Sequence, residues 1–452
     1  MKESKKVLKL CCGVTAVTLS LSFVPPVSIG GTHMRKVDML SGLRVKDDMP
    51  AAADSVKERK KVLANGTYAS DTWPDSVIII EDYSHGSGGG MAHFYAALNR
   101  RRSLQQPVRI AFLGDSFIEG DILAGDLREM LQCHFGGNGI GWIDAADKRN
   151  GVRPTIKIET RGLTDHQIRT KNVDYGLCGF QMRYATLGAD NSIVLQGSKY
   201  KPHAATWQKA IMYISCASST PTRVSIGAQP EHTDTIAPSD QMQEITYRGH
   251  TGSMALSLSP VCAKGNILYG VALEPPQGVV VDNFSIRGFS GDAICKASKS
   301  VMRQFARLRE YDLIILEYGL NNANDKNTDL HYRVYMNKMK GVIALMRELY
   351  PDASVLVMGV PDRSRHTADG FETMPCIETM TSWQRQLASS QKVAFYSLYQ
   401  AMGGRNSMRE YVDHKDANKD YTHLTLSGGE RLAKRIYRSI LTGLNNYNTR
   451  NK

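Results

Sequence analysis

Beyond its first thirty residues, the sequence has no apolar run of the roughly 20 residues that a membrane-spanning helix needs. Its cysteines lack the close pairing of a zinc site. The Gly-rich stretch at 85–90 lacks the lysine of a phosphate-binding loop. No basic segment interleaved with aromatic residues indicates a nucleic-acid module. These absences exclude a polytopic membrane protein and argue against metal-binding, nucleotide-binding and nucleic-acid-binding functions.

The composition is that of a globular protein. Hydrophobic residues make up 42% and charged residues 22% of the 452 residues, which leaves room for two or three domains, each with a hydrophobic core. The formal net charge of +12 favours anionic surroundings such as cell-wall polymers or membrane surfaces. The plainer alternative is a solvated basic surface. The charge therefore suggests a location and leaves the activity open.

The N-terminus has the pattern of an export signal. Four lysines within the first nine residues precede an apolar run at 14–24, followed by small residues and prolines. This predicts a signal peptide over 1–29 and a protein exported to the periplasm or cell envelope. An uncleaved N-terminal membrane anchor is the alternative, and lipidation is not expected. Residues 30–75 are polar without periodicity and predict a linker.

Two kinds of pattern follow the linker. Residues 76–148 and 279–445 alternate apolar strand-like runs with helical spacing, which predicts one α/β domain with a mostly parallel sheet covered on both faces. Residues 149–278 consist of short β-rich runs between Gly, Pro, Asp and Ser turns. We therefore expect an all-β sandwich or jelly roll inserted into the α/β domain.

The α/β pattern predicts individual elements. The expected strands lie at 77–80, 108–113, 279–286, 312–316, 354–360 and 393–398. The expected helices lie at 91–100, 122–135, 293–308, 335–350, 378–388 and 427–441. In such sheets, ligands and catalytic groups gather beyond the carboxyl ends of the strands.

Three loops in those positions carry polar residues that could act together. Ser116 follows the strand at 108–113, Asn321 follows the strand at 312–316, and Asp420 and His423 precede the final helix. A serine hydroxyl becomes a nucleophile when a histidine base takes its proton and a carboxylate orients that histidine. We therefore predict Ser116 as nucleophile, His423 as general base and Asp420 as the orienting carboxylate.

The oxyanion that forms during such a reaction needs fixed hydrogen-bond donors. The backbone amide of Ser116, a glycine amide and the side chain of Asn321 could supply them. Each motif alone is weak, because an Asp-x-x-His stretch usually lies on the solvated surface and Asn-Asn usually forms a turn. Their order along the chain gives the combination its weight.

This order resembles the SGNH (GDSL) hydrolase superfamily, whose blocks are Gly-Asp-Ser, an oxyanion glycine, Gly-x-Asn-Asp and Asp-x-x-His. The corresponding stretches are FLGDSF, FSIRGFSGDA, YGLNNA and DYTHLT. The resemblance implies a three-layer α/β/α fold and a serine carboxylic-ester hydrolase that uses no metal or organic cofactor. It also implies an oxyanion hole formed by Ser116, Gly291 and Asn321, with Gly288 as a second register for the glycine. Asn322 departs from the acidic residue that is usual in the third block.

A narrower resemblance is to bacterial peptidoglycan O-acetylesterases, which carry a β module similar to a carbohydrate-binding module between the first two blocks. The stretches GDSFIEGDILAGDLREMLQCHFGGNGIGWI and LYGVALEPPQGVVVDNFSIRGFSG carry this similarity. It implies an O-acetylated glycan substrate, namely muramic acid residues of peptidoglycan. The alternatives are an acetylesterase for another polysaccharide, a glycan O-acetyltransferase, and an inactive wall-binding protein.

Other residues have two interpretations. His134 and His166 could line the site or serve the structure, and His414 beside Asp413 is a rival base without the motif spacing. Trp142 and Trp207 could contact sugar rings or pack in the core. Six cysteines beyond the predicted signal permit either disulfides or buried free thiols. The sequence carries no signal for an oligomeric state.

Overall fold

The structure is a computed structural model of the 452-residue chain. It describes residues 28–29, 32–33, 71–85, 90–144, 146–147, 152–171, 173–258 and 264–452. Most of the predicted signal peptide and linker, residues 86–89 of the Gly-rich stretch, and Cys262 lie outside these ranges. The chain divides into two compact units, Met1–Glu58 and Arg59–Lys452. The described part of the first unit is an antiparallel pair of strands, β1 (Ser28–Ile29) and β2 (Thr32–His33).

The second unit contains a six-stranded sheet in the order β14-β4-β15-β16-β19-β3. The first five strands are parallel, and β3 pairs antiparallel with β19 at the edge. The strands are β3 (Glu81–Asp82), β4 (Val108–Gly114), β14 (Val279–Ser285), β15 (Leu313–Glu317), β16 (Ser354–Gly359) and β19 (Ala394–Ser397). Every residue of β4, β15 and β16 is buried, which explains their continuous apolar runs. The mostly parallel sheet expected from the sequence is therefore present.

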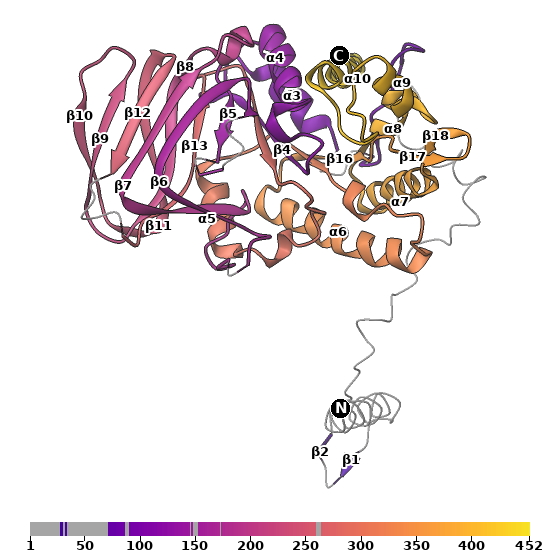
Figure 1. Cartoon of the computed structure of the whole chain (residues 1–452), viewed down its shortest axis with the longest axis horizontal. Helices are drawn as coiled ribbons and strands as arrows, with labels where there is room; N and C mark the ends of the chain where they lie inside the picture. The colour runs from indigo at the N-terminus through magenta and orange to yellow at the C-terminus, as the bar shows by residue number, and fades with distance from the viewer. Residues whose placement is uncertain are drawn as a thin grey trace. The chain divides into compact units, whose positions relative to one another are not determined.

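Helices lie on both sides of this sheet (Figure 1). Figure 1 shows α3, α4 and α10 on one side and α5, α6 and α7 on the other. The helices are α3 (Ala92–Arg100), α4 (Ala124–Phe135), α5 (Lys299–Leu308), α6 (Asp329–Leu349), α7 (Pro375–Gln391), α8 (Leu398–Met402), α9 (Ser407–Asp413) and α10 (Leu426–Arg450). The first group packs with the sheet around a core that includes Phe94, Leu127 and Ile436. No helix in the described ranges is long and apolar enough to cross a membrane.

Some predicted boundaries are wrong, for local reasons. Residues 77–80 form no strand: the Val77 amide closes a turn onto the Pro74 carbonyl at 2.8 Å, and the strand begins only at Glu81. The helix expected at 293–308 begins at Lys299, because the Ser298 hydroxyl caps it by accepting the Val301 amide at 3.3 Å. Helix α6 begins six residues earlier than expected, because Thr328 starts it with a reciprocal capping contact to His331.

The inserted β region forms a second, nine-stranded sheet. Its main path runs β10-β9-β12-β7-β13-β8-β11, with β5 paired to β13 and β6 paired to β7, and every pair is antiparallel. The strands are β5 (Gly141–Ile143), β6 (Ile156–Gln167), β7 (Arg183–Gly197), β8 (Trp207–Cys216), β9 (Thr220–Ile226), β10 (His232–Ile236), β11 (Ser239–Thr251), β12 (Ser253–Leu258) and β13 (Ile267–Glu274). Strand β5 lies before the predicted boundary at 149, yet its pairing places it in this sheet.

The β region has its own hydrophobic core, which includes Trp207, Met212 and Leu256. Strand β9 shows how the sequence builds it, because buried residues alternate with less buried ones along the strand. The described cysteines are free: Cys178, Cys216 and Cys376 are buried, and Cys133 and Cys295 are exposed. Hydrophobic packing of antiparallel strands therefore shapes this region.

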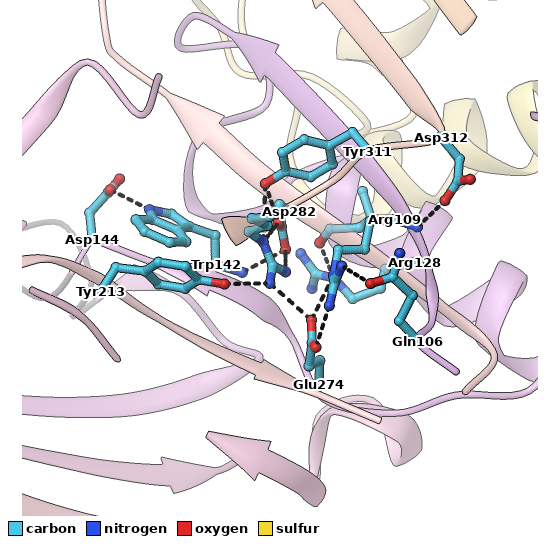
Figure 2. A network of polar contacts seen from close by, with 12 residues as sticks. Gln106, Arg109, Arg128, Trp142, Asp144, Tyr213, Glu274, Asp282, Tyr311 and Asp312 are labelled. Atoms are coloured by element: carbon cyan, nitrogen blue, oxygen red, sulfur yellow. Dashed lines mark hydrogen bonds and ion pairs between the residues drawn. The ribbon is translucent and has the colours of Figure 1, made fainter. Parts of the chain in front are cut away.

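A buried charged cluster joins the two sheets (Figure 2). Arg109 of β4 and Arg309 both bind Glu274 of β13, at 2.7 and 2.9 Å. Arg309 also pairs with Asp282 of β14 at 2.6 Å, and Asp282 accepts the Trp142 amide of β5 at 2.9 Å. These side chains are at most 6% exposed. We call Arg109, Glu274, Asp282 and Arg309 the junction cluster.

Candidate active site

The expected functional loops meet beyond the carboxyl ends of neighbouring strands. Strand β4 ends at Gly114, two residues before Ser116. It lies between β14, which leads to Gly291, and β15, which leads to Asn321. Ser116 itself is only 9% exposed. The parallel arrangement thus brings segments far apart in the chain to one edge of the sheet.

Ser116, His423 and Asp420 form a continuous hydrogen-bonded chain. The Ser116 Oγ lies 2.9 Å from His423 Nε2, and His423 Nδ1 lies 2.6 Å from Asp420 Oδ2. The other carboxylate oxygen of Asp420 accepts the backbone amides of Thr422 and His423, both at 3.0 Å. Although partial burial disfavours the Asp420 charge, these hydrogen bonds outweigh it and lower the pKa of the carboxyl. The arrangement can remove the serine proton and stabilise an imidazolium.

Both glycines proposed as oxyanion donors adopt left-handed backbone conformations. Gly291 has φ of +78°, and a Cβ there would lie 2.5 Å from the Tyr318 ring, so a side chain does not fit. Gly288 has φ of +67° and lies against the guanidinium of Arg169. The Gly291 carbonyl accepts the Ile294 amide at 3.1 Å in a tight turn. The loop backbone therefore requires glycine at both positions.

The Asn321 side chain lies beside the serine loop, but its amide group is engaged there. Asn321 Nδ2 donates to Asp115 Oδ2 at 2.6 Å and to the Phe289 carbonyl at 3.3 Å. The two hydrogens of this group thus have two partners. A reaction that needs Asn321 as a donor would have to redirect one of them, and the longer contact with Phe289 is the weaker.

Two buried carboxyl groups next to the Ser116 loop received no role from the sequence. Asp115 and Glu317 are both fully buried, and the Asp115 amide lies 3.5 Å from Glu317 Oε2. Burial raises the pKa of Asp115 to about 6, against the opposing effects of the Phe117 amide and His423. Burial and the nearby Asp115 charge raise the pKa of Glu317 well above its usual value. The signal was available, because Glu317 ends an otherwise apolar strand.

The β domain also reaches the loop that holds Gly288 and Gly291, called the oxyanion loop after its expected role. The Arg169 guanidinium, just after β6, donates to the Arg287 carbonyl, next to Gly288. The Arg287 side chain in turn binds Glu119, with Nε 2.8 Å from Oε2, three residues after Ser116. These two arginines were not singled out from the sequence, because surface arginines carry no local motif.

The other candidate residues lie in structural contacts. His134 Nδ1 contacts the Tyr437 hydroxyl at 2.8 Å, and His166 Nε2 contacts Thr186 Oγ1 at 3.0 Å within the β sheet. His414 Nδ1 lies 3.8 Å from Glu410 Oε1 and is not joined to Ser116. Trp142 and Trp207 are at most 1% exposed and pack in the interior, so neither offers a face to a sugar.

Two cavities differ in their relation to the site. One of about 340 Å³ is lined by Asp292 and Asn322, the residues next to Gly291 and Asn321, and by Leu330 of α6. A larger one of about 630 Å³ is lined by Pro107 and Asp312, which precede β4 and β15 and so lie at the opposite end of the sheet from Ser116. Within the described residues, no group of three His, Cys, Asp or Glu side chains could hold a metal ion.

Comparison with known proteins agrees with this geometry. The GDSL-like Lipase/Acylhydrolase family matches residues 266–431, a stretch that holds Gly291, Asn321, Asp420 and His423 but not Ser116. No curated protein matches the chain significantly. A solved peptidoglycan O-acetylesterase is similar in structure, with a TM-score of 0.67 and 20% sequence identity over 81% of this chain and 99% of that one.

A carbohydrate esterase of family two from Clostridium thermocellum, solved in complex with cellohexaose, is similar at a TM-score of 0.30 and 10% identity, over 63% of this chain and all of that one. The fold is that of the peptidoglycan O-acetylesterase, with a hydrolase domain and an inserted β domain. The family match covers β14, β15 and the loops of Gly291, Asn321 and His423, but not β4 and Ser116. The chain is therefore a serine ester hydrolase, and its residues 266–431 are similar to the GDSL-like Lipase/Acylhydrolase family.

Proposed function

We propose that this protein removes O-acetyl groups from a cell-wall glycan, most specifically peptidoglycan, through an acyl-serine intermediate. The observation that carries the proposal is the hydrogen-bonded chain from Ser116 to His423 to Asp420, with distances of 2.9 and 2.6 Å. A serine linked to a carboxylate-oriented histidine is the arrangement that nucleophilic acyl transfer requires.

In the first half-reaction, His423 Nε2 accepts the Ser116 proton while Oγ attacks the acetyl carbonyl carbon. Asp420 stabilises the imidazolium that forms. The amides of Ser116 and Gly291 and the side chain of Asn321 hold the negative oxygen of the tetrahedral intermediate. For this, one N–H of Asn321 turns away from the Phe289 carbonyl. Collapse of the intermediate breaks the ester bond, and the proton on His423 passes to the departing sugar hydroxyl.

In the second half-reaction, His423 takes a proton from a water molecule that attacks the acyl-serine. The second tetrahedral intermediate collapses to acetate, and the proton returns to Ser116 Oγ. This chemistry uses groups of the chain itself and needs no metal or organic cofactor.

Three features support peptidoglycan as the substrate. The chain shares its fold over 81% of its length with a peptidoglycan O-acetylesterase. Its β domain contacts the oxyanion loop through Arg169, so the domain is placed to influence what reaches the serine. Its net charge of +12 suits an anionic wall. The N-terminal pattern supports export to the periplasm or cell envelope, with retention on the membrane as the alternative.

The esterase proposal is tested by replacing the nucleophile. Purified Ser116→Ala protein should lose hydrolysis of 4-nitrophenyl acetate, because no other hydroxyl contacts His423 Nε2 among the described residues. Ser103→Ala, at an exposed serine three residues after α3, is the matched control and should keep the wild-type rate. A Ser116→Ala enzyme that hydrolyses the ester at the wild-type rate would refute the assignment.

The substrate proposal is tested by comparing acetate release from O-acetylated peptidoglycan and from acetylated xylan, with acetyl transfer to a glycan acceptor measured alongside. We expect peptidoglycan to be preferred and water to be the acceptor. Preference for xylan would indicate an esterase for another polysaccharide, and dominant transfer would indicate an O-acetyltransferase. If the wild-type protein releases no acetate but wall sacculi still sediment the Ser116→Ala protein, the chain would instead be a wall-binding protein.

A further inference from the structure

A short hairpin contacts two loops that carry proposed functional groups, the loop of Asn321 and the loop of Asp420 and His423. It consists of β17 (Ser364–Thr367) and β18 (Gly370–Thr373), which pair antiparallel between β16 and α7. A two-stranded hairpin alone is marginally stable, so its position depends on contacts with the rest of the protein. The hairpin belongs to neither of the two larger sheets.

Two of these contacts reach the Asp420–His423 segment. The Phe371 ring stacks on the Tyr421 ring, with centroids 3.5 Å apart and planes 8° from parallel. The Ser364 amide donates to the Tyr421 carbonyl at 3.1 Å. Tyr421 is thus held on its ring and on its backbone by two residues from opposite strands of the hairpin.

Tyr421 needs such support because its backbone is in an unfavourable conformation. Its φ is +52°, the left-handed region that residues with a Cβ seldom adopt. The chain reversal there lets Asp420 Oδ1 accept the amides of Thr422 and His423, while Oδ2 meets His423 Nδ1. If Tyr421 relaxed to an ordinary conformation, the carboxylate would move away from the imidazole.

Burial does not hold this pair in place. The side chain of Asp420 is 49% exposed and that of His423 is 28% exposed. Exposed ion pairs gain little and are easily separated. The register of the two groups therefore depends on the local turn, and the turn is braced from outside by the hairpin.

The same hairpin is anchored to the Asn321 loop. Arg365 Nη1 binds Asp325 Oδ2 at 2.7 Å, and Asp325 follows Asn321 by four residues. Asp325 Oδ1 also accepts the Cys376 amide at the start of α7, at 3.0 Å. The hairpin consequently connects the loop of a proposed oxyanion donor with the loop of the proposed base.

We propose that the β17–β18 hairpin braces the catalytic loop, and that Phe371 is a positioning residue that keeps Tyr421 left-handed and Asp420 in register with His423. This inference rests on the proposed function, because it concerns the same serine, histidine and carboxylate.

The first test removes the ring. Phe371→Ala should lower kcat for 4-nitrophenyl acetate by about tenfold or more, because a misplaced carboxylate weakens the base. KM should change by less than about twofold, since a small ester does not need the hairpin for binding. Phe371→Tyr keeps a stacking ring and should restore kcat. Glu372→Gln, at the residue after Phe371, is the matched control. It removes the ion pair with Arg365 but leaves the ring stack, so kcat should stay near the wild-type value.

The second test separates the ring from the backbone strain. Tyr421→Ala and Tyr421→Gly both remove the stack, but glycine adopts the left-handed conformation without penalty. The glycine variant should therefore retain a several-fold higher kcat than the alanine variant.

The outcomes distinguish this inference from the proposed function. Wild-type kcat in Phe371→Ala, or a Tyr421→Gly enzyme no more active than Tyr421→Ala, would overturn the positioning role. A lower melting temperature with unchanged kcat would likewise make Phe371 merely structural. If wild-type activity does not depend on Ser116, the proposed function itself fails. Should Phe371→Ala not fold, the two Tyr421 variants still decide the question.

Discussion

The junction cluster and the proposed catalytic chain of Ser116, His423 and Asp420 both pair a carboxylate with a basic side chain, but under opposite conditions of burial. In the junction cluster, Arg309 is fully buried and meets two carboxylates, Glu274 and Asp282. In the catalytic chain, the side chains of His423 and Asp420 are partly exposed. His423 contacts Ser116 and Asp420, and Asp420 otherwise contacts only backbone amides of its own turn among the contacts described above. Burying a charge is costly unless it is fully matched, whereas a group that must exchange protons has to stay reachable. The two clusters therefore divide stability and chemistry between them.

The carboxyl groups show the same contrast. Although burial opposes it, contact with Arg109 and Arg309 lowers the pKa of Glu274 to about 2. Asp115 is as deeply buried but faces no arginine, and burial raises its pKa to about 6. Charge partners, more than depth, thus decide whether a buried carboxyl in this protein favours or opposes folding at neutral pH.

The largest expected effect comes from removing the base of the catalytic chain. His423→Ala should lower kcat/KM for 4-nitrophenyl acetate by about 10⁴-fold, because Ser116 then has no acceptor for its proton. The melting temperature should change little, since His423 is partly exposed. His414→Ala, an exposed histidine nine residues earlier, is the control and should keep its activity. A loss below tenfold in His423→Ala would contradict the division of roles.

The second variant removes one positive charge from the junction cluster. Arg309→Met should lower the free energy of unfolding by about 3–5 kcal/mol, because Glu274 and Asp282 remain as buried charges. Urea denaturation followed by fluorescence measures this change. The folded fraction should keep its kcat, because the cluster does not contact Ser116. A destabilisation under about 1 kcal/mol would show that the cluster is not a stabilising junction.

The third variant concerns Asn321, whose side chain contacts Asp115 and Phe289 and is the proposed donor to the oxyanion. Asn321→Ala should lower kcat by about 10²–10³-fold through loss of one donor to the transition state. It also frees Asp115 of its amide partner. Steady-state kinetics with 4-nitrophenyl acetate provide the measurement, and unchanged kcat would exclude Asn321 from the oxyanion hole.

The two buried carboxyls should give opposite pH dependences. Glu274 has a folded pKa below its unfolded value, so its contribution, on the order of 3 kcal/mol, is present above pH 4.5 and lost as the pH falls toward 2. Asp115 has a raised folded pKa, so its ionisation costs stability as the pH rises from about 4 through 6.

Urea denaturation at several pH values tests this difference. Asp115→Asn should be more stable than wild type above pH 6, by on the order of 1–3 kcal/mol, and equal to it below pH 4. Its activity should fall, because Asn321 loses its anionic partner. Equal stability at pH 8 would show that Asp115 is not strained by burial in the folded protein.

The smallest effect is expected from an exposed pair of the same chemistry. Arg161 and Asp190 of the β domain lie 3.5 Å apart, with side chains 72% and 81% exposed. Arg161→Ala should change the free energy of unfolding by less than about 0.5 kcal/mol. A loss comparable to that of Arg309→Met would show that burial is not what separates the two kinds of ion pair.

Much of the hydrolase domain could be predicted because its signals are local. The buried strands β4, β15 and β16 are continuous apolar runs, and the helices around them repeat apolar residues with helical spacing. Errors fell at element ends, where Ser298 and Thr328 caps set the boundaries of α5 and α6. The apolar run at 77–80 was wrongly predicted as a strand, because Ile78 and Ile80 pack against the core without strand pairing, while Ile79 is exposed.

The sequence by itself determined the residue types of the site and their order: a serine after a buried strand, an asparagine after another, and an aspartate three residues before a histidine. Only the tertiary structure decided what surrounds them. Asp115 with Asn321, Phe371 on Tyr421 and Arg169 on the oxyanion loop join segments far apart in the chain. Such contacts leave no periodic or motif signal, because each partner alone is an ordinary residue in its own segment. Their role arises when the fold buries a charge, stacks a ring or closes a turn.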